Sequence, residues 1–328
     1  MAATTDSQAG GGADRLARLS GLGLFAVAVW GASFVATRVA LTTVRPFGLV
    51  AIRLLLGAAV LLAVVVWRRG SLPGPRRALV EDPRDLWSAA GLALILSLHL
   101  LLQAYGLEHT SAINAGWIIS FTPVALAVTA QALGRQRLRG RGWLGVALGA
   151  VGVSTVTLRT PPDLVHARWG DLLQVLSCFT WTAYTLASGP LVARYGALRT
   201  TALTMSIAAV FTGIVAAATG WRQPSDFVPP GPPVTSLEVL GALLFLGPVC
   251  SGLAYYAWFA AVDRDGPTRV GALLYLEPFV TVAVAWTWRD EPVYIPALLG
   301  GVLVLLGVRL VARGAQPTVA VPRPAEPV

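Results

Sequence analysis

Residues 120–152 read SFTPVALAVTAQALGRQRLRGRGWLGVALGAVG, and residues 275–307 read YLEPFVTVAVAWTWRDEPVYIPALLGGVLVLLG. The two stretches correspond after a shift of 155 positions, because in both an apolar segment with a proline precedes a short polar segment and a glycine-spaced apolar segment. A single register that aligns several glycines and prolines indicates an internal duplication. The aligned pairs are Gly116 with Gly271, Pro123 with Pro278, Gln136 with Glu291, Gly145 with Gly300, and Gly152 with Gly307.

The chain around this repeat has the composition of a membrane protein. Of its 328 residues, 55% are hydrophobic and 12% are charged, and the mean hydropathy is +0.67. A helix crosses the hydrocarbon with about 17 to 25 apolar residues, whereas a barrel strand shows about 10 residues of alternating polarity. Continuous runs such as LLLGAAVLLAVVVW (54–67) therefore predict helices. The predicted spans are 21–42, 47–67, 86–106, 112–133, 142–158, 171–193, 200–221, 237–261, 267–288 and 293–312.

Five of these spans fall in each copy of the repeat. Because five is odd, the second copy must cross the membrane in the opposite sense to the first. Inverted repeats of this kind recur in secondary transporters, whose binding site lies near the midplane where the halves meet. We therefore predict an all-α integral membrane protein with ten transmembrane helices in two inverted five-helix repeats. The predicted division is a cytoplasmic N-terminal segment (1–20), a first repeat (21–158), a linker (159–170), a second repeat (171–312) and a disordered cytoplasmic tail (313–328), with a further extended or disordered Pro-rich segment at 222–236.

The net charge of +9 comes from arginines, because the chain has no lysine. With both termini placed in the cytoplasm, 18 arginines fall on inner segments and 5 on outer ones. This excess follows the positive-inside rule and explains the charge better than a nucleic-acid footprint does. We therefore expect a multi-pass protein of the cytoplasmic membrane with both termini inside and no nucleic-acid partner. The lysine-free, Ala- and Arg-rich residue usage points to a bacterial source.

Several motifs, in their order and spacing, resemble the EamA-type transporters of the drug/metabolite transporter superfamily. The first half carries WGASFVATRVAL, AIRLLL and YGLEHTSAINAGWIISFTPV, and the second carries DLLQVLSCFTWTAYT, AYYAWFAAVDRDGPTRVGALLYLEPFV and RDEPVYIPALLGGVLVLLG. The resemblance covers roughly residues 20–312. It implies ten helices, cytoplasmic termini and export or exchange of small organic solutes through a central cavity. The family usually has a glutamate where this chain has Gln136, whereas Glu291 keeps it in the second half.

Glu277 is the acidic residue that lies deep inside a predicted span. An ionised side chain at the bilayer centre costs about 2.5 to 3.5 kcal/mol on insertion scales, so a function or a partner must offset that cost. A Glu277 that faces a gated cavity can contact a substrate, or take up and release a proton as water access changes. The alternative is a protonated or Arg-paired residue that holds helices together.

Pro278 and Pro123 weaken one helix in each half. Each removes a backbone hydrogen bond and disfavours helix at the preceding residue. In lipid the freed carbonyls need protein or cavity water as partners, so we expect both kinks to face the interior and line a site. Kinks that serve packing alone are the alternative.

Polar and aromatic residues recur at helical spacing on several spans, and positions three and four apart share one face. Such faces can line a cavity whose aromatic walls suit flat or amphipathic solutes. For each residue singly, interhelical hydrogen bonding or interfacial anchoring is the alternative. The predicted cavity residues are Trp30, His99, Gln103, Asn114, Trp181, Tyr184 and Tyr255.

Arg38 and Arg53 lie in the outward thirds of the first two spans under this topology. Their long side chains can snorkel to the outer interface. The alternatives are that they attract an anionic group or pair with Glu277.

Glycines at three- and four-residue steps predict close helix packing near the pseudo-two-fold axis. Neither glycine-rich stretch matches a phosphate-binding loop. The two cysteines fall in apolar spans and the three histidines have no ligand spacing, so we expect no cofactor and no metal site. The glycines concerned are Gly145, Gly149, Gly152, Gly300 and Gly307.

Together these patterns predict a permease or exporter that moves small metabolites or drug-like solutes by alternating access. Its expected partners are the solute, the lipid bilayer and, where transport is coupled at Glu277, protons. A passive channel or facilitator is one alternative. A membrane-embedded transferase is another, but the loops supply only single acids and no catalytic spacing, so we do not expect an enzyme. The patterns leave the substrate open, as well as the choice between monomer and homodimer.

Overall fold

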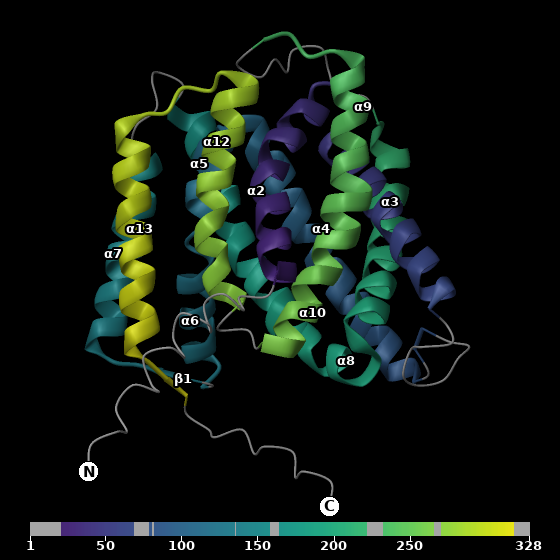
Figure 1. Cartoon of the computed structure of the whole chain (residues 1–328), viewed down its shortest axis with the longest axis horizontal. Helices are drawn as coiled ribbons and strands as arrows, with labels where there is room; N and C mark the ends of the chain where they lie inside the picture. Colours follow the sequence, from purple (N-terminus) through teal and green to yellow (C-terminus); the bar gives the residue numbers. More distant parts are fainter. Residues whose placement is uncertain are drawn as a thin grey trace, which may run out of the picture.

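Nearly all described residues lie in helices, as the apolar runs predict (Figure 1). The structure is a computed structural model that describes residues 21–68, 79–80, 82–134, 136–157, 164–221, 232–265 and 270–317. The predicted N-terminal segment (1–20) and residues 222–231 of the Pro-rich segment lie outside this range.

The first five predicted spans correspond to six helices and a short strand. The predicted span 112–133 is two helices, because the chain turns at Ser120 and Phe121 and then restarts with Pro123 in the first turn, where proline is tolerated. The elements are α2 (Gly21–Leu41), α3 (Pro46–Trp67), α4 (Pro83–His109), α5 (Ala112–Ile119), α6 (Thr122–Ala132), β1 (Gln136–Leu138) and α7 (Gly140–Thr157).

The second half begins with one long element that bends. α8 spans two predicted helices and reverses at Gly196, whose φ of 78° and ψ of 160° favour glycine. Because α8 starts at Leu164, the predicted linker 159–170 is partly helical. The elements are α8 (Leu164–Thr219), α9 (Ser236–Leu244), the π-helix η1 (Phe245–Ala254), α10 (Tyr255–Asp265), the 3₁₀-helix η2 (Ala272–Leu276), α12 (Glu277–Arg289), α13 (Ile295–Gly314) and β2 (Ala315–Pro317).

The outside of the bundle is apolar. Large side chains such as Leu55, Ile214 and Ile295 are more than 60% exposed, and seven described stretches are long and apolar enough to cross a bilayer. The chain is therefore a multi-pass membrane protein. Length and composition alone do not confirm the predicted total of ten, because α7 and α12 are not among the seven.

Two antiparallel helices, α7 and α13, pack against each other at one edge of the bundle (Figure 1). Gly145 lies against Gly307, and Gly152 lies against Gly300. A Cβ on Gly152 would lie 2.7 Å from the Gly300 carbonyl oxygen, and a Cβ on Gly300 would lie 2.6 Å from the Gly152 carbonyl oxygen. Gly149 completes the contact, since its backbone nitrogen would lie 2.6 Å from a Cβ on Gly307. Only glycine allows two backbones this close.

Two short strands join these helices at one end. β1 pairs antiparallel with β2, with Gln136 opposite Pro317 and Leu138 opposite Ala315. We call this end of the bundle the strand face and the other end the opposite face (Figure 1). The predicted disordered tail began at residue 313. In the structure, α13 continues to Gly314 and β2 follows to Pro317, so residues 313–317 have regular structure. The fold is therefore nearly all-α rather than all-α.

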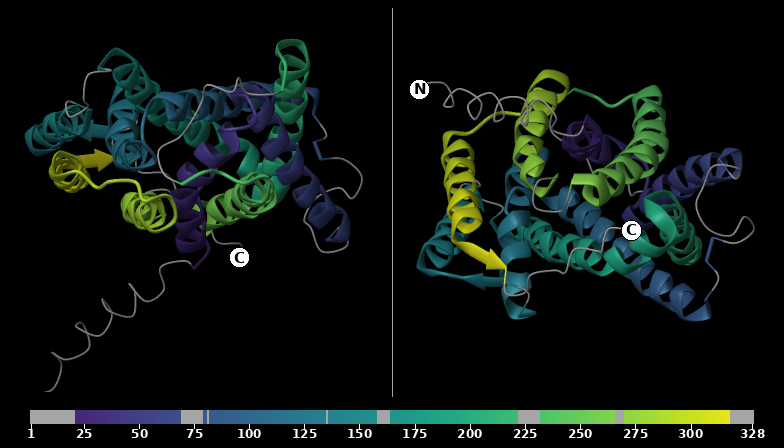
Figure 2. Two further views of the ribbon diagram at one scale, coloured as in Figure 1. Left: turned by 90° about the horizontal axis from the view of Figure 1, so that it is seen from above. Right: turned by 60° about the horizontal axis from the view of Figure 1, so that its bottom comes forward.

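The middle of the bundle is occupied by α2, which contacts α12 on one side and α9, η1 and α10 on the other (Figure 2). The approach of α2 to α12 depends on Gly31, where a Cβ would lie 2.7 Å from the Glu277 carbonyl oxygen. Thr281 Oγ1 donates a hydrogen bond to the Gly31 carbonyl oxygen at 2.9 Å. These contacts fix the start of α12 beside the centre of α2.

Candidate functional site

A cavity lies beside α2, between elements of the first and second halves of the chain. The free space between its lining atoms is about 400 Å³, and this figure includes open solvent. Seven of the predicted site residues line it, namely Trp30, Arg53, His99, Gln103, Trp181, Tyr255 and Glu277. The other lining residues are Ser33, Phe34, Leu100, Ile119, Thr122 and Leu274.

One wall of the cavity is a cluster of aromatic rings around Trp30. The ring of Trp30 lies 5.1 Å from Trp181, 5.2 Å from Tyr255 and 5.1 Å from Trp258, measured between centroids. Its Nε1 donates to the Cys250 carbonyl oxygen at 3.4 Å. Aromatic pairs at these distances stabilise one another beyond the area they bury. The ring contacts and this hydrogen bond therefore hold the aromatic side chains of the wall in place.

Arg53 enters the cavity from α3 and is only 4% exposed. Its Nε donates to Ser251 Oγ at 3.0 Å, and its Nη2 donates to Cys250 Sγ at 3.3 Å. Both partners belong to the π-helix η1, where Pro248 breaks the regular hydrogen-bond ladder. Gly57 lets α3 approach, since a Cβ there would lie 2.9 Å from the Ser251 Cβ. Arg53 thus lies inside the protein and does not snorkel to an interface.

Glu277 enters from the junction of η2 and α12 and is 3% exposed. Its Oε2 is buried and accepts no hydrogen bond from any described residue. No arginine nitrogen of the described residues lies within 4.0 Å of the Glu277 carboxylate oxygens. Among these residues, Glu277 is therefore not paired with Arg38 or Arg53. Pro278 follows it in the first turn of α12 and does not line the cavity.

His99 and Gln103 come from α4. His99 Nδ1 lies 3.1 Å from the Ser177 carbonyl oxygen. Because a carbonyl only accepts, Nδ1 carries the hydrogen, and Nε2 of the neutral ring is an acceptor. The His99 ring also packs on Trp181, 5.2 Å away. Gln103 is held through its backbone, whose carbonyl oxygen accepts from Gln174 Nε2 at 2.9 Å.

A second cavity of about 370 Å³ adjoins the first and shares Thr122, Trp181 and Leu274 with it. Pro123 lines this second cavity, whereas its repeat equivalent Pro278 lines neither cavity. Its lining also contains three buried polar atoms without a hydrogen-bond partner among the described residues. They are Thr182 Oγ1, Thr185 Oγ1 and Trp258 Nε1.

Three further predicted site residues, Asn114, Tyr184 and Arg38, line neither cavity. Asn114 is buried in the first turn of α5, where its backbone nitrogen donates to Ser111 Oγ. Tyr184 is 1% exposed and packs behind Trp181 at 5.9 Å, with its hydroxyl 3.1 Å from Thr204 Oγ1. Tyr184 therefore supports the aromatic wall without facing the cavity. Arg38 lies at the opposite face.

A buried charge cluster at the opposite face contains Arg38. Its Nη1 lies 3.8 Å from Glu291 Oε2, and Glu291 Oε1 accepts from the Ile113 backbone nitrogen at 3.2 Å. Arg289, also buried, donates to the Pro232 carbonyl oxygen. The cluster therefore ties the ends of α2 and α12 to the start of α5.

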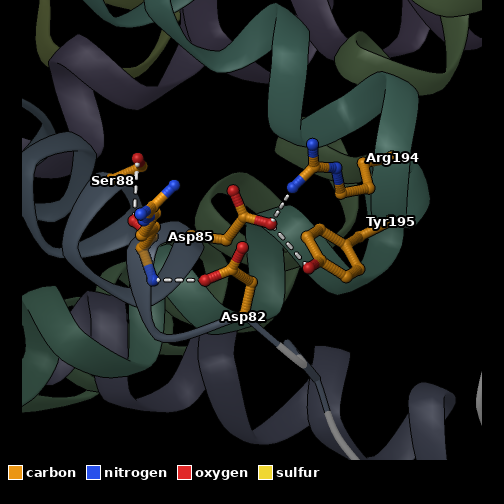
Figure 3. A network of polar contacts seen from close by, with 6 residues as sticks. Asp82, Asp85, Ser88, Arg194 and Tyr195 are labelled. Carbon is orange, nitrogen blue, oxygen red and sulfur yellow. Dashed lines mark hydrogen bonds and ion pairs between the residues drawn. The ribbon is translucent and has the colours of Figure 1, made fainter.

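The strand face has a more exposed network, shown in Figure 3. Asp85 Oδ2, in the first turn of α4, accepts from Arg194 Nη1 at 2.5 Å and from the Tyr195 hydroxyl at 2.7 Å. Asp82 caps α4 by accepting from the Arg84 backbone nitrogen at 2.8 Å. These contacts hold the start of α4 beside the bend of α8.

The sequence patterns do not single out several residues of these sites. Glu291 follows the end of α12 and is buried at 5% exposure. Cys250 Sγ accepts from Arg53. Arg289 is also buried. The signal for Glu291 and Arg289 was their position directly after a span, beside a helix end with free backbone groups.

The sequence model of the EamA-like transporter family matches this chain twice, over residues 20–158 and 168–313. A protein of Archaeoglobus fulgidus named an uncharacterized transporter is 27% identical over 287 residues, which is 86% of this chain and 93% of that protein. A probable terminal-alkyne amino-acid exporter of Streptantibioticus cattleyicolor is 29% identical over 291 residues, covering 88% and 91%.

A solved crystal structure shares the fold. It aligns with a TM-score of 0.60 at 20% identity and covers 88% of this chain and 94% of that chain.

Proposed function

Because this chain belongs to the EamA-like transporter family, we propose that it is a secondary transporter that moves small organic solutes through the central cavity by alternating access. The observation that carries the proposal is the cavity itself. It combines a buried guanidinium, a buried carboxyl group without a partner among the described residues, and a fixed aromatic wall. Such groups cost stability in a protein that only has to pack.

The proposal includes ten crossings in two inverted repeats. The two arms of α8, on either side of Gly196, count as two crossings, while α5 with α6, α9 with η1 and α10, and η2 with α12 count as one each. The glycine contacts support the inversion. The 155-residue shift turns the pair Gly145–Gly307 into Gly300–Gly152, which is the other contact of the same antiparallel helices. A two-fold axis between α7 and α13 has this property.

Alternating access would expose the cavity at one membrane face at a time. The Arg38–Glu291 cluster closes the opposite face around α5, and the Asp85–Arg194 contact lies at the strand face. Glu277 is the coupling residue of the proposal, because its carboxyl group has no partner among the described residues and can exchange a proton when water reaches it.

The proposed setting is a bacterial cytoplasmic membrane with both termini in the cytoplasm, as the arginine distribution predicts. The solute class is small organic metabolites or drug-like compounds, and the name of the S. cattleyicolor relative is consistent with it. Export is the proposed direction. Protons are the proposed coupling ion, and nucleic acid is not among the proposed partners.

Counterflow in proteoliposomes tests the proposal. The full chain is reconstituted, loaded with a pooled extract of small metabolites, and challenged with the same pool in labelled form, with and without a pH gradient. A carrier accumulates label transiently against the chemical gradient, whereas a passive channel only equilibrates it. Absence of saturable counterflow for every compound in the pool would contradict the proposal.

Glu277→Gln separates coupling from transport. The variant is expected to keep counterflow of a solute that does not need the charge, but to lose the dependence of flux on the pH gradient. Asp263→Asn, on the exposed surface of α10, is the matched control. If the pH gradient drives both variants equally, the coupling role is wrong.

A further inference from the structure

A groove runs along the outer surface of the bundle between α3 and the arm of α8 that follows Gly196, at the edge away from α7 and α13 (Figure 1). The volume open to water-sized molecules is about 330 Å³ in this groove, and about 30 Å³ in each of the two cavities described above. The groove therefore reaches the lower end of the range for ligand sites.

The lining of the groove is apolar and faces outward. Ala58 and Ala209 are buried in it, whereas Leu55 and Val210 are each 63% exposed beside it. The hydroxyl of Ser206, which also lines the groove, donates to a carbonyl oxygen of its own helix at 2.7 Å. A surface of this composition in a membrane protein accepts a hydrocarbon chain and offers little to a polar solute.

Gly213 keeps the groove open, although nothing in the packing requires a glycine there. A Cβ at this position would meet no atom within 4 Å, and the φ angle of Gly213 is not positive. Glycine in the interior of a helix is destabilising relative to alanine. A ligand that occupies the space beside Gly213 gives this residue a use that packing does not.

The length of the groove matches one leaflet of the bilayer. Its lining on α3 runs from Ala51 to Leu62, which is roughly 16 Å along a helix axis, and half of the hydrocarbon thickness is about 15 Å. Trp221, which follows α8, lines the end of the groove at the opposite face. Tryptophan is enriched where the hydrocarbon meets the headgroups.

Arg45 lies beside this end of the groove. Its backbone nitrogen donates to the Trp221 carbonyl oxygen at 3.0 Å, and its Nη1 donates to the Thr219 carbonyl oxygen at 2.8 Å. A guanidinium has five N–H donors, and no carboxylate of the described residues lies within 4.0 Å of this one. The apolar groove therefore has a positive charge with unused donors at one end.

From these features we propose that the groove binds one anionic phospholipid, with an acyl chain along α3 and the phosphate at Arg45. Arginine contacts phosphate oxygens through parallel N–H donors, and basic sites between membrane helices bind anionic headgroups. A choline headgroup brings a second positive charge to Arg45, so phosphatidylglycerol fits better than phosphatidylcholine. A helix of a second copy covers the apolar groove but leaves Arg45 without an anion. The inference needs membrane insertion and does not depend on transport.

Native mass spectrometry of the full chain in detergent tests this inference. The protein is titrated with phosphatidylglycerol, with phosphatidylcholine of the same acyl chains, and with glycerol phosphate, which has the phosphate without the chains. We expect the first phosphatidylglycerol to bind at least about fivefold more tightly than the first phosphatidylcholine, and glycerol phosphate not to bind. Equal binding of the two lipids, or tight binding of glycerol phosphate, overturns the proposal.

Two variants separate the headgroup from the chain. In Arg45→Gln, both lipids are expected to bind with the wild-type affinity for phosphatidylcholine. Gly213→Phe fills the groove and should weaken both lipids by at least about tenfold, without a clash, because the Cβ has free space. Arg141→Gln, at an exposed arginine of α7, and Gly241→Phe, at a glycine of α9 whose Cβ also meets no atom within 4 Å, are the matched controls.

Each outcome of the variants decides the proposal. It is wrong if Gly213→Phe binds phosphatidylglycerol as the wild type does, or if Arg45→Gln keeps the preference for that lipid. Ala59→Trp blocks the groove from α3 if Gly213→Phe does not fold. The same spectra report the oligomeric state: a wild-type dimer that Gly213→Phe dissociates would assign the groove to a second copy of the chain and overturn the lipid site.

Discussion

Helix α12 begins at one buried glutamate and is followed directly by another, and the two have opposite surroundings. Glu277 faces the central cavity with Oε2 unpartnered. Glu291, 14 positions later in the sequence and roughly 20 Å away along a helix axis, accepts from the Ile113 backbone and lies 3.8 Å from Arg38. Each glutamate has an arginine from an early helix nearby, but only Glu291 is joined to it.

The difference separates two uses of buried charge. A joined pair of buried charges holds elements together, and losing one partner is costly. An unjoined pair stabilises nothing in the empty protein, so its contribution is expected when a ligand supplies the missing charges. Substitutions at the two ends of α12 should therefore have opposite effects on stability and transport.

Glu291→Gln has the largest expected effect on stability. It leaves Arg38 buried without a counter-charge, so the free energy of unfolding should fall by about 3 to 5 kcal/mol. Thermal denaturation in detergent measures this loss, and hydrogen exchange in α5 should rise because Ile113 loses a charged acceptor. Asp290→Asn is the control, since Asp290 is exposed and its φ of 50° suits asparagine. If Glu291→Gln melts at the same temperature as the wild type, Glu291 does not stabilise the fold and does not differ from Glu277 in this respect.

Glu277→Gln should lower transport without lowering thermal stability. Proton-driven transport should fall about 100-fold, which corresponds to about 2.7 kcal/mol. Thermal stability should hold or rise, because a neutral amide replaces a carboxyl group that has no partner among the described residues. Initial rates in proteoliposomes and a melting curve on the same preparation measure both quantities. A variant that melts well below the wild type would show that Glu277 has a structural partner.

The two arginines provide a finer test. Arg53→Lys should lower transport about tenfold, because an ammonium group cannot reproduce the planar fork that contacts Ser251 and Cys250 together. Arg38→Lys should change transport by less than about threefold, since a single point charge can keep a 3.8 Å pairing. Dose–response curves for one labelled solute compare the two. Similar losses for both lysine variants would contradict the comparison.

Asp85→Asn should have the smallest effect. Its partner Arg194 is 60% exposed, so water and salt screen the contact. The capping of α4 by Asp82 does not depend on it. We expect melting and transport close to the wild type at physiological ionic strength, and a clear loss of either would assign this network in Figure 3 a role in closing the strand face.

Much of the fold could be predicted because membrane helices are recognised in a sequence by their length and apolar composition. Helix ends such as Gly21–Leu41 and Pro46–Trp67 lie within one residue of the predicted spans. The breaks could not be placed as well. The π-helix η1 and the turn between α5 and α6 depend on contacts between helices, while periodicity reports only one helix at a time.

The candidate site was accessible where a residue was chemically unusual for its span. Glu277 and Arg53 stand out because charge is rare in hydrocarbon, and both line the cavity. Tyr184 and Asn114 share polar spacing with the lining residues but are buried and do not line the cavity. Which side of a helix faces a cavity depends on its rotation in the bundle, and a sequence that is apolar on most sides does not encode that rotation clearly.

The pairing of β1 with β2 has a consequence for motion. It joins the end of α6 in the first repeat to the end of α13 in the second with main-chain hydrogen bonds. These bonds carry no charge, so neither acidity nor salt weakens them directly. Residues 315–317 therefore link the two repeats at this edge, and we expect the proposed motion of one half against the other to be largest away from it.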